Sequence, residues 1–256
     1  MNLEINGPRI WFRIPLGDAI SIPVTDTAIS SFVVMVVLCT LCVVLGRGLT
    51  KRPGRRQVLV EKVVGMLYGM VEDTMGAHNI KFAPYIGALF ASSILGSLIS
   101  TTGVFRAATA DLSTTATWAL LTTFIVWGSN IKENGFLGWL KGFTEPVVVM
   151  TPMNLISEVA SPVSMAFRHF GNVVGDSVLT TLVYYALATA SSFVLGWIPN
   201  AFIASIPILQ VGVPAVLSLY FDFFSGAIQA LVFCMLSMVY IGAANPPHPE
   251  KEEAGK

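Results

Sequence analysis

Long apolar runs separated by short charged stretches dominate this chain of 256 residues. The first run, residues 28–45, has the length and composition of a helix that crosses a membrane, with Asp26 and Thr27 as candidate N-caps. The densest basic cluster follows directly and comprises Arg47, Lys51, Arg52, Arg55 and Arg56. Because basic residues are retained on the cytoplasmic side, residues 1–27 are expected outside and residues 46–81 on the cytoplasmic side.

Residues 58–76 read VLVEKVVGMLYGMVEDTMG and have a different pattern. Apolar residues recur at helical spacing, and Glu61, Lys62, Glu72 and Asp73 interrupt them. A helix with one apolar and one charged face lies in the membrane interface rather than across the bilayer. The pattern therefore predicts an amphipathic interfacial helix within residues 46–81.

Residues 82–131 predict a second and a third span joined by a polar loop. The second span, residues 82–102, is rich in glycine and serine, which suits close helix packing in lipid. The third span, residues 112–131, follows Asp111 and includes Ser113, either of which is a candidate N-cap. The mixed-charge segment after it is expected to be a cytoplasmic loop that lies partly in the interface.

Two much longer apolar segments occupy residues 146–244, one ending near Gly196 and the other starting near Asn200. A helix of about 40 residues is about 60 Å long, roughly twice the thickness of the hydrocarbon core. Each segment is therefore either two spans or one strongly tilted span, and the only clear turn lies around Gly196 and Pro199. We expect a hairpin of two long tilted helices, which gives about five spans in total and a cytoplasmic C-terminus.

Composition places the chain among the all-α integral membrane proteins. Hydrophobic residues make up 54% and charged residues 12% of the chain, whereas soluble domains carry about 25% charged residues. The zero formal net charge argues against a nucleic-acid partner, and residues 1–27 lack the charge order of a cleaved signal peptide. Cys39, Cys42 and Cys234 show no spacing of a disulfide framework or metal site, and no cofactor is expected. The tail, residues 245–256, is rich in proline and charge and is expected to be disordered.

Ionisable residues inside the long apolar segments are the strongest sign of function, because placing a charge within a bilayer is costly. In the first long segment, one helical face consists mainly of small residues around a central arginine: Ser157, Ser161, Ser164, Arg168, Gly171, Asn172 and Gly175. Small residues allow another helix to approach closely, whether it belongs to a partner or to the same chain. Arg168 lies too far from either end of the segment to reach water easily.

Acidic residues flank Arg168 in both directions along the chain. Asp176 lies about 12 Å from Arg168 along the helix, toward the outside, and Glu158 lies about 15 Å away toward the cytoplasm. On the second long helix, Asp222 and Gln229 share a face, so Asp222 reaches the depth of Asp176 if Gln229 is level with Arg168. The polar residues thus suggest an outer path at the two aspartates and an inner path at Glu158.

An arginine between two such paths would block direct flow, because a fixed cation repels protons and other cations. Arg168 would also favour the ionised form of a carboxylate that a partner carries past it. Such a carboxylate could take up a proton from one path and release it into the other, and His169 could also face the outer path. Plainer alternatives stay open: an ion pair between an aspartate and Arg168 or His169, helix capping by Glu158, and a local hydrogen bond for His169.

These residues stand in a pattern that resembles subunit a of F-type ATP synthases. PMNLISEVASPVSMAFRHFGNVVGD, residues 152–176, is similar to the signature helix of that family, with Arg-x-Phe-Gly-Asn beginning at Arg168. TADLSTTATWAL, residues 109–120, resembles the Thr-x-Asp-Leu segment of the family, and FDFFSGAIQALVFCMLSMVYIG, residues 221–242, resembles its last helix. The resemblance covers most of the chain after about Tyr85.

The resemblance implies a non-catalytic stator subunit of a rotary motor that couples ion flow to ATP synthesis, in a bacterial plasma membrane. In that family the arginine faces a ring of c subunits, and two offset half-channels load and unload protons on the ring carboxylates. The b subunit of the stator, other subunits of the complex and membrane lipid are further expected partners. By matching positions, the expected ion-translocation residues are Arg168, Gln229, Asp176, Asp222, Asn172, Glu158 and His169.

The chain departs from the family pattern at a few positions. His169 stands where many members have leucine, Ser161 where lysine is common, and Ala108 where proline is common. The spacing from Asn172 to Asp176 is one residue shorter than in members that carry a glutamate there. The choice between H⁺ and Na⁺ as coupling ion lies mostly in the ring subunit of this family, and protons are the default expectation.

Two other classes of protein fit the sequence less well. A stand-alone secondary transporter that binds an anionic substrate at Arg168 would be expected to show internal repeats or broken helices, and neither is evident. An intramembrane enzyme would need a metal-ligand cluster or a paired nucleophile and base, which the sequence does not display. The nucleotide-binding pattern G-x-x-x-x-G-K-[ST] is also absent, so the chain is not expected to be an enzyme by itself.

Overall fold

The computed structural model describes residues 10–15, 21–51, 53–102, 107–145, 147–195 and 220–247. A short β-hairpin comes first, in which β1 (Ile10–Pro15) pairs antiparallel with β2 (Ser21–Thr25). The main helices are α1 (Asp26–Gly46), α2 (Arg55–Met75), α3 (Ala83–Leu98), α4 (Leu112–Gly142), α5 (Thr151–Leu195) and α8 (Gly226–Ala244). Shorter helical turns adjoin them: η1 (Ala77–Phe82), η2 (Ile99–Thr102), η3 (Ala108–Ala110), η4 (Val148–Met150) and the π-helical η6 (Tyr220–Ser225).

Helices long and apolar enough to cross a membrane confirm the expected class of multi-pass helical membrane protein. Among the described residues there are 4 such stretches: Asp26–Gly46, Ala77–Leu98, Val148–Phe193 and Phe223–Ala244. Helix α4 is not one of them, so the expected total of about five spans stays a prediction. The β-hairpin was not predicted from the sequence and adds a small strand element to a helical body.

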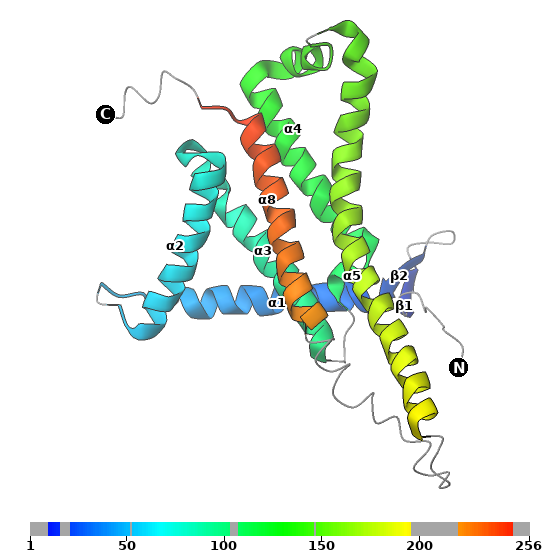
Figure 1. Ribbon diagram of the computed structural model, residues 1–256. Coiled ribbons are helices and arrows are strands. Elements are labelled where there is room, and N and C mark those ends of the chain that lie inside the picture. The colour runs from blue at the N-terminus through cyan, green and yellow to red at the C-terminus, as the bar shows by residue number, and fades with distance from the viewer. Residues whose placement is uncertain are drawn as a thin grey trace.

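The helices do not all run in the same direction (Figure 1). Helix α1 lies across the bundle, and the axes of α2, α5 and α8 make a large angle with the axis of α1. Helix α8 lies centrally and packs against α2, α3, α4 and α5. If α1 follows the membrane normal, α2 lies along the surface and α5 and α8 are strongly tilted. Tilting is the expected response of α5, whose 45 residues are longer than the bilayer is thick.

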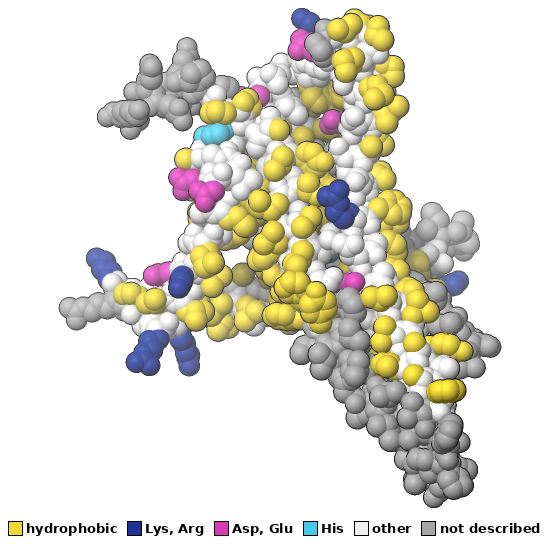
Figure 2. All heavy atoms as spheres, viewed as in Figure 1, with side chains coloured by type: hydrophobic (Ala, Val, Ile, Leu, Met, Phe, Trp, Pro, Cys, Tyr) yellow, Lys and Arg dark blue, Asp and Glu magenta, His cyan; other side chains and the backbone are white. Residues whose placement is uncertain are grey.

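The packed core lies around α8, which contributes Phe233, Cys234, Met238 and Ile241. Its partners come from α2, α3, α4 and α5: Val71, Met75, Ala83, Ile86, Leu89, Ala119, Met165 and Ala166. The outer surfaces of α5 and α8 are covered mainly by hydrophobic side chains, with few charged ones among them (Figure 2). Such a surface suits contact with lipid or with another apolar helix.

Helix α4 is longer than the expected third span, residues 112–131. It begins at Leu112 as expected but continues to Gly142, with a break at Gly135, whose φ is +71°. Glycine adopts a positive φ at little steric cost, so the chain kinks there between two helical stretches. Most of the segment expected to be a loop is therefore helical.

The N-caps of two helices can be compared with expectation. Helix α1 is capped by Thr25, whose Oγ1 accepts a hydrogen bond from a first-turn backbone N–H at 3.4 Å, and not by Asp26 or Thr27. The expected caps are used elsewhere: the carboxylate of Asp26 accepts from the indole of Trp11, and Thr27 bonds to Asp111. For α4 the expectation is confirmed, because Asp111 Oδ1 accepts from the backbone N–H of Ser113 at 2.9 Å.

The first of the two long helices is present as a single helix, α5, of 45 residues. The second is described only from Tyr220 onward, as η6 and α8, and residues 196–219 lie outside the described ranges. The expected length of the second helix and the turn between the two therefore stay predictions. Helices α5 and α8 pack against each other, as expected for a hairpin.

Candidate functional site

The part of the small-residue face of α5 around Arg168 is exposed in the described structure, whereas Asn172 of the same face contacts α8. Arg168 is exposed, and so are Ser164, Gly171 and Gly175 on the same face. A methyl group added at either glycine would meet nothing within 4 Å in the described part of the chain. No described residue forms a hydrogen bond or ion pair with Arg168. The exposed part of this face is thus not used for packing within the described chain, although small residues there permit a close approach.

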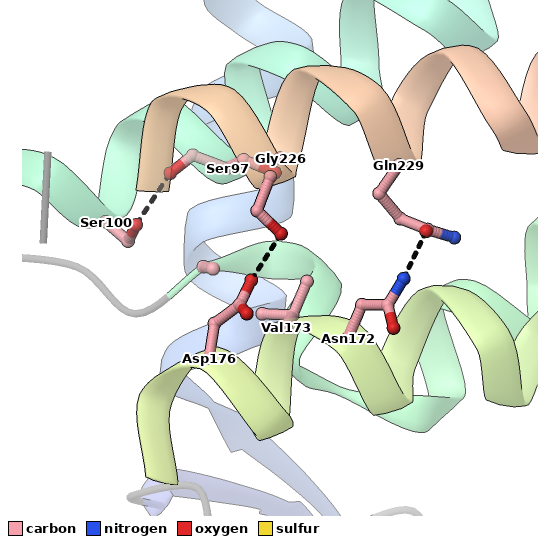
Figure 3. Close-up of a pocket in the computed structure, with 9 residues that line it drawn as sticks. Ser97, Ser100, Asn172, Val173, Asp176, Gly226 and Gln229 are labelled. Atoms are coloured by element: carbon pink, nitrogen blue, oxygen red, sulfur yellow. Dashed lines mark hydrogen bonds between the residues drawn. The ribbon is translucent and has the colours of Figure 1, made fainter. Parts of the chain in front are cut away.

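Two hydrogen bonds fix the register between α5 and the start of α8 (Figure 3). Asn172 donates its amide N–H to Gln229 Oε1, and Ser225 donates its hydroxyl to Asp176 Oδ2 at 2.6 Å. Asp176 does not pair with Arg168. Because these bonds set Gln229 level with Asn172, Gln229 lies one turn away from the level of Arg168.

This register corrects the assumption that Gln229 lies level with Arg168. The ring of Phe233, one turn beyond Gln229, contacts His169 at a centroid distance of 5.3 Å. Asp176 is instead level with Ser225. Asp222 belongs to η6, one turn before Ser225, but its side chain lies outside what the structure describes.

A cavity with several polar side chains in its lining lies where α3, α5 and α8 meet. Its volume is about 30 Å³, and its lining consists of Ser97, Ser100, Ala107, Asn172, Val173, Asp176, Ser225, Gly226 and Gln229 (Figure 3). Ala107 of the lining is close in sequence to Asp111. The carboxylate of Asp111 accepts a hydrogen bond at 2.7 Å from Oγ1 of Thr27, which lies in the first turn of α1. This cavity, called the outer cavity below, therefore lies toward the N-terminal end of α1.

A second cavity, called the inner cavity below, lies between α4, α5 and α8. Its volume is about 60 Å³, and its lining consists of Thr122, Thr123, Val126, Glu158, Ser161, Pro162, Met165 and Tyr240. The indole N–H of Trp127 donates to Glu158 Oε1. Tyr240 lies close to Gly242, where α8 packs on Met75 of α2. The inner cavity is therefore on the side of α2, which follows the basic cluster.

Along α5, the two cavities lie on opposite sides of Arg168. Glu158 is about 15 Å before Arg168 and Asp176 is about 12 Å after it, at 1.5 Å per helical residue. Each cavity thus holds one described carboxylate, and the exposed arginine separates them. This arrangement has the form of two offset polar paths interrupted by a fixed cation.

His169 does not line either cavity in the described part of the chain. Its side chain is fully buried, its Nε2 lies 3.2 Å from Ser93 Oγ, and its ring packs edge-on against Trp118 and Phe233. Neighbouring residues on a helix point in different directions, so Arg168 faces outward while His169 faces the core. This position corrects the expectation that His169 faces the outer path, and it favours the alternative of a local hydrogen bond.

Two residues at the cavities were not predicted from the sequence. Ser97 contributes a hydroxyl group to the outer cavity, and Trp127 donates a hydrogen bond to Glu158 of the inner cavity. Ser225 stands four residues before Gln229, and this spacing predicts that the two share a helical face. Ser97 and Trp127 belong to other helices, and only the packing of those helices brings them to the site.

Asp111 of the Thr-x-Asp-Leu segment links the outer ends of α1 and α4 and does not line either cavity. Partial burial raises the pKa of its carboxyl, but hydrogen bonds from Thr27 and Ser113 outweigh burial, so the pKa is lowered overall. Within the described ranges, no cluster of three or more His, Cys, Asp or Glu side chains could hold a metal ion.

Long apolar helices, an exposed arginine and two cavities that each contain one described carboxylate define a multi-pass membrane protein with the features of an ion-translocating subunit. Residues 28–242 match the family described as ATP synthase A chain, and the chain belongs to this family. It is accordingly an ion-translocating component of the membrane sector of an ATP synthase and not a catalytic subunit by itself.

Curated relatives support this membership over most of the chain. The chain is 34% identical over 266 residues to "ATP synthase subunit a, sodium ion specific" of Propionigenium modestum, covering 93% of this chain and 84% of the relative. It is 32% identical to "ATP synthase subunit a 1" of Crocosphaera subtropica, covering 85% of each chain. It is 29% identical to "ATP synthase subunit a 2" of a Bradyrhizobium species, covering 87% of this chain and 90% of the relative.

Proposed function

We propose that this chain forms two offset half-channels that load and unload the coupling ion on the carboxylates of a rotating ring of c subunits. The observation that carries the proposal is the exposed Arg168 on α5, which has no hydrogen bond or ion pair among the described residues, with one carboxylate-bearing cavity on each side of it along the helix. The outer cavity belongs to the first half-channel and the inner cavity to the second. An ion cannot pass directly between them, because the fixed cation repels it.

The ring completes the path on the small-residue face of α5. A ring carboxylate that approaches Arg168 loses its ion, since a nearby positive charge favours the ionised carboxylate. Rotation then carries the carboxylate to the other half-channel, where it is loaded again. Asp176, Asn172 and Gln229 serve the outer half-channel, Glu158 serves the inner one, and Asp222 is a further candidate on the outer side.

The topology that fits this function places the basic cluster and α2 on the cytoplasmic side of a bacterial plasma membrane. Arg47, Lys51, Arg55 and Arg56 are all exposed at the corner between α1 and α2. Helix α2 runs steeply to α1 and so can lie in the interface (Figure 1). With α4 as the third span, the N-terminus lies outside, the C-terminus is cytoplasmic, and the chain has about five spans. The b subunit, other subunits of the complex and lipid are its further partners.

The test is ion-driven ATP synthesis in membrane vesicles that carry the complete complex with Arg168→Ala. We expect synthesis and ATP-driven ion pumping to be lost while the complex still assembles, because the barrier between the half-channels is removed. Passive ion leak through the membrane sector should rise. His169→Leu, which places the residue common in the family beside an intact arginine, is the matched control and should retain synthesis.

Near-normal synthesis and pumping by the assembled Arg168→Ala complex would overturn the barrier mechanism. The competing proposal, a stand-alone transporter with an anionic substrate at Arg168, predicts transport by the purified chain without other subunits. The family membership does not favour that alternative.

A further inference from the structure

The β1–β2 hairpin has one apolar face and one more polar face. Its antiparallel register groups four apolar positions together: Phe12 opposite Val24, and Ile14 opposite Ile22. Because successive strand positions belong to opposite faces, Arg13 falls on the other side of the hairpin. Two strands alone are only marginally stable in water, so a hairpin with this pattern needs something to cover its apolar face.

The described part of the chain does not cover this apolar face. Phe12 is 54% exposed, and Arg13 on the other face is exposed as well. Among the described elements, β1 and β2 pack chiefly on each other and on α1. The apolar face is therefore available to the surroundings of the hairpin.

The surroundings of the hairpin are set by α1, because Thr25 both ends β2 and caps the helix. Figure 1 shows the hairpin at the end of α1 opposite to α2, with its strands at a large angle to the axis of α1. If α1 follows the membrane normal, the strands lie along the membrane surface at the level where the span begins.

A β-bulge at Trp11 ties the hairpin to the first residue of α1. The register shifts between Ile10 and Phe12, which leaves Trp11 as the extra residue. Bulges re-aim side chains, and here the indole N–H of Trp11 donates to the carboxylate of Asp26. Trp11 is still 62% exposed. Tryptophan is enriched at membrane–water boundaries, where its ring contacts acyl chains and its N–H has a polar partner.

Lipid is expected next to the hairpin because the described chain leaves much of α1 uncovered. Phe32 lies about 9 Å along the helix from Asp26, and Phe32 and Met35 are both exposed. Since α1 is long and apolar enough to cross a membrane, these side chains face acyl chains. Lipid around α1 therefore begins at the level of the hairpin.

We propose that the β1–β2 hairpin docks on the lipid of the leaflet at the N-terminal end of α1. The face with Phe12 enters the boundary between headgroups and acyl chains, Trp11 lies among the headgroups, and Arg13 stays on the water side. Docking also fixes the depth of α1, whose first turn holds Thr27 against Asp111. The inference needs only that α1 crosses the membrane, so it is independent of the proposed half-channels.

The experiment uses the complete complex in vesicles that contain a phospholipid with a photoreactive diazirine on an acyl carbon near the headgroup. After irradiation, mass spectrometry maps the lipid adducts on this chain. We expect adducts on β1 around Phe12. A second phospholipid, with the diazirine at the end of the acyl chain, should label the middle of α1 and leave β1 unlabelled.

Phe12→Ser removes the largest side chain of the apolar face and should abolish most of the labelling of β1. Phe12→Leu keeps an apolar side chain and should retain the labelling. Pro23→Ser is the matched control, because it makes a change to serine at an exposed residue on the opposite face and should leave the labelling unchanged. Labelling of α1 by the second phospholipid shows in each variant that the helix still spans.

Three results would overturn the inference. Labelling of α1 without any adduct on β1 would mean that the hairpin stands away from the lipid. Equal labelling of β1 in Phe12→Ser and in the unmodified complex would mean that lipid contacts another face. Finally, Phe12→benzoylphenylalanine should form lipid adducts on irradiation, and a crosslink to another subunit in their place would make the apolar face a protein interface.

Discussion

At the scale of single residues, Asp111 shows how a motif residue can serve the fold instead of the ion path. One carboxylate oxygen caps α4 through the N–H of Ser113, and the other accepts the Thr27 hydroxyl at the start of α1. A carboxylate at a helix N-terminus is also favoured by the helix dipole. Asp111 therefore fastens two helices at the outer end of the bundle, close to Ala107 of the outer cavity.

Replacing Asp111 by asparagine should lower the stability of the complex at neutral pH by about 1–2 kcal/mol, since the charged acceptor is lost and a neutral one remains. The folded-state pKa of Asp111 lies below its ordinary value of 3.8. Its stabilising contribution is therefore fully present above that value and is lost as the pH falls through the folded-state pKa.

Thermal unfolding of the detergent-solubilised complex, followed from pH 7 down to about pH 3, measures this effect. The difference between the unmodified and Asp111→Asn complexes should shrink at the acidic end. Asp73→Asn, at an exposed acid on α2, is the control and should cost little at any pH. A difference that stays constant with pH would show that the charge of Asp111 contributes nothing.

At the scale of elements, the close approach of α3 and α8 shapes the outer cavity. A Cβ atom added at Gly226 would lie 2.8 Å from Ser97 Cβ and 3.0 Å from Ser97 Oγ. Ser97 Cβ is tied to the backbone of α3 and cannot rotate away. Glycine at this position therefore allows the two helices to bring Ser97 and Ser225 to the same cavity.

Gly226→Ala should push α8 away from α3, displace Ser97 from the outer cavity and reduce ion-driven synthesis severalfold, with a cost of about 1–3 kcal/mol for overpacking. Gly128→Ala on α4 is the matched control, because nothing lies within 4 Å of its added methyl group. The measurement is synthesis rate per assembled complex. Equal rates for the two variants would show that the contact between Gly226 and Ser97 does not set the shape of the cavity.

The elements also show what the sequence could and could not predict. Apolar length was sufficient for α1 and α5, because a long apolar run has few alternatives in a membrane protein. The β-hairpin was missed because a single short hairpin gives a weak pattern. The extent of α4 was missed because Gly135 and its polar neighbours resemble a loop, although the helix resumes after the break.

Within the candidate site, the sequence predicted which residues share a helix but not how α5 and α8 are aligned. Helical spacing was enough to group Asn172 and Asp176 with Arg168 on one segment. The register against α8 was off by one turn, because it depends on which small residues allow contact between helices, and periodicity does not contain that information. The same limit explains why His169 was expected in the path and is found in the core.

At the scale of the whole molecule, the described part of the chain leaves the strip of α5 around Arg168 without a partner. Gly171 and Gly175 lie on the exposed side of α5 with Arg168, and the described chain places nothing against them. Hydrophobic side chains surround this strip on α5 and α8 (Figure 2). In lipid alone a larger side chain would be accepted there, whereas a helix packed closely against the glycines would exclude it.

Gly171→Leu separates these two situations, because a Cβ atom added there meets nothing within 4 Å in the described part of the chain. If the ring packs on this face, leucine should hold it away from Arg168, so that synthesis falls about tenfold or more and the ring is retained less well on purification. Gly128→Leu adds the same side chain at a position on α4 that is equally open in the chain, and it should assemble and function normally. Normal synthesis and ring retention with Gly171→Leu would mean that the ring contacts another face, and Arg168 would then need a different partner.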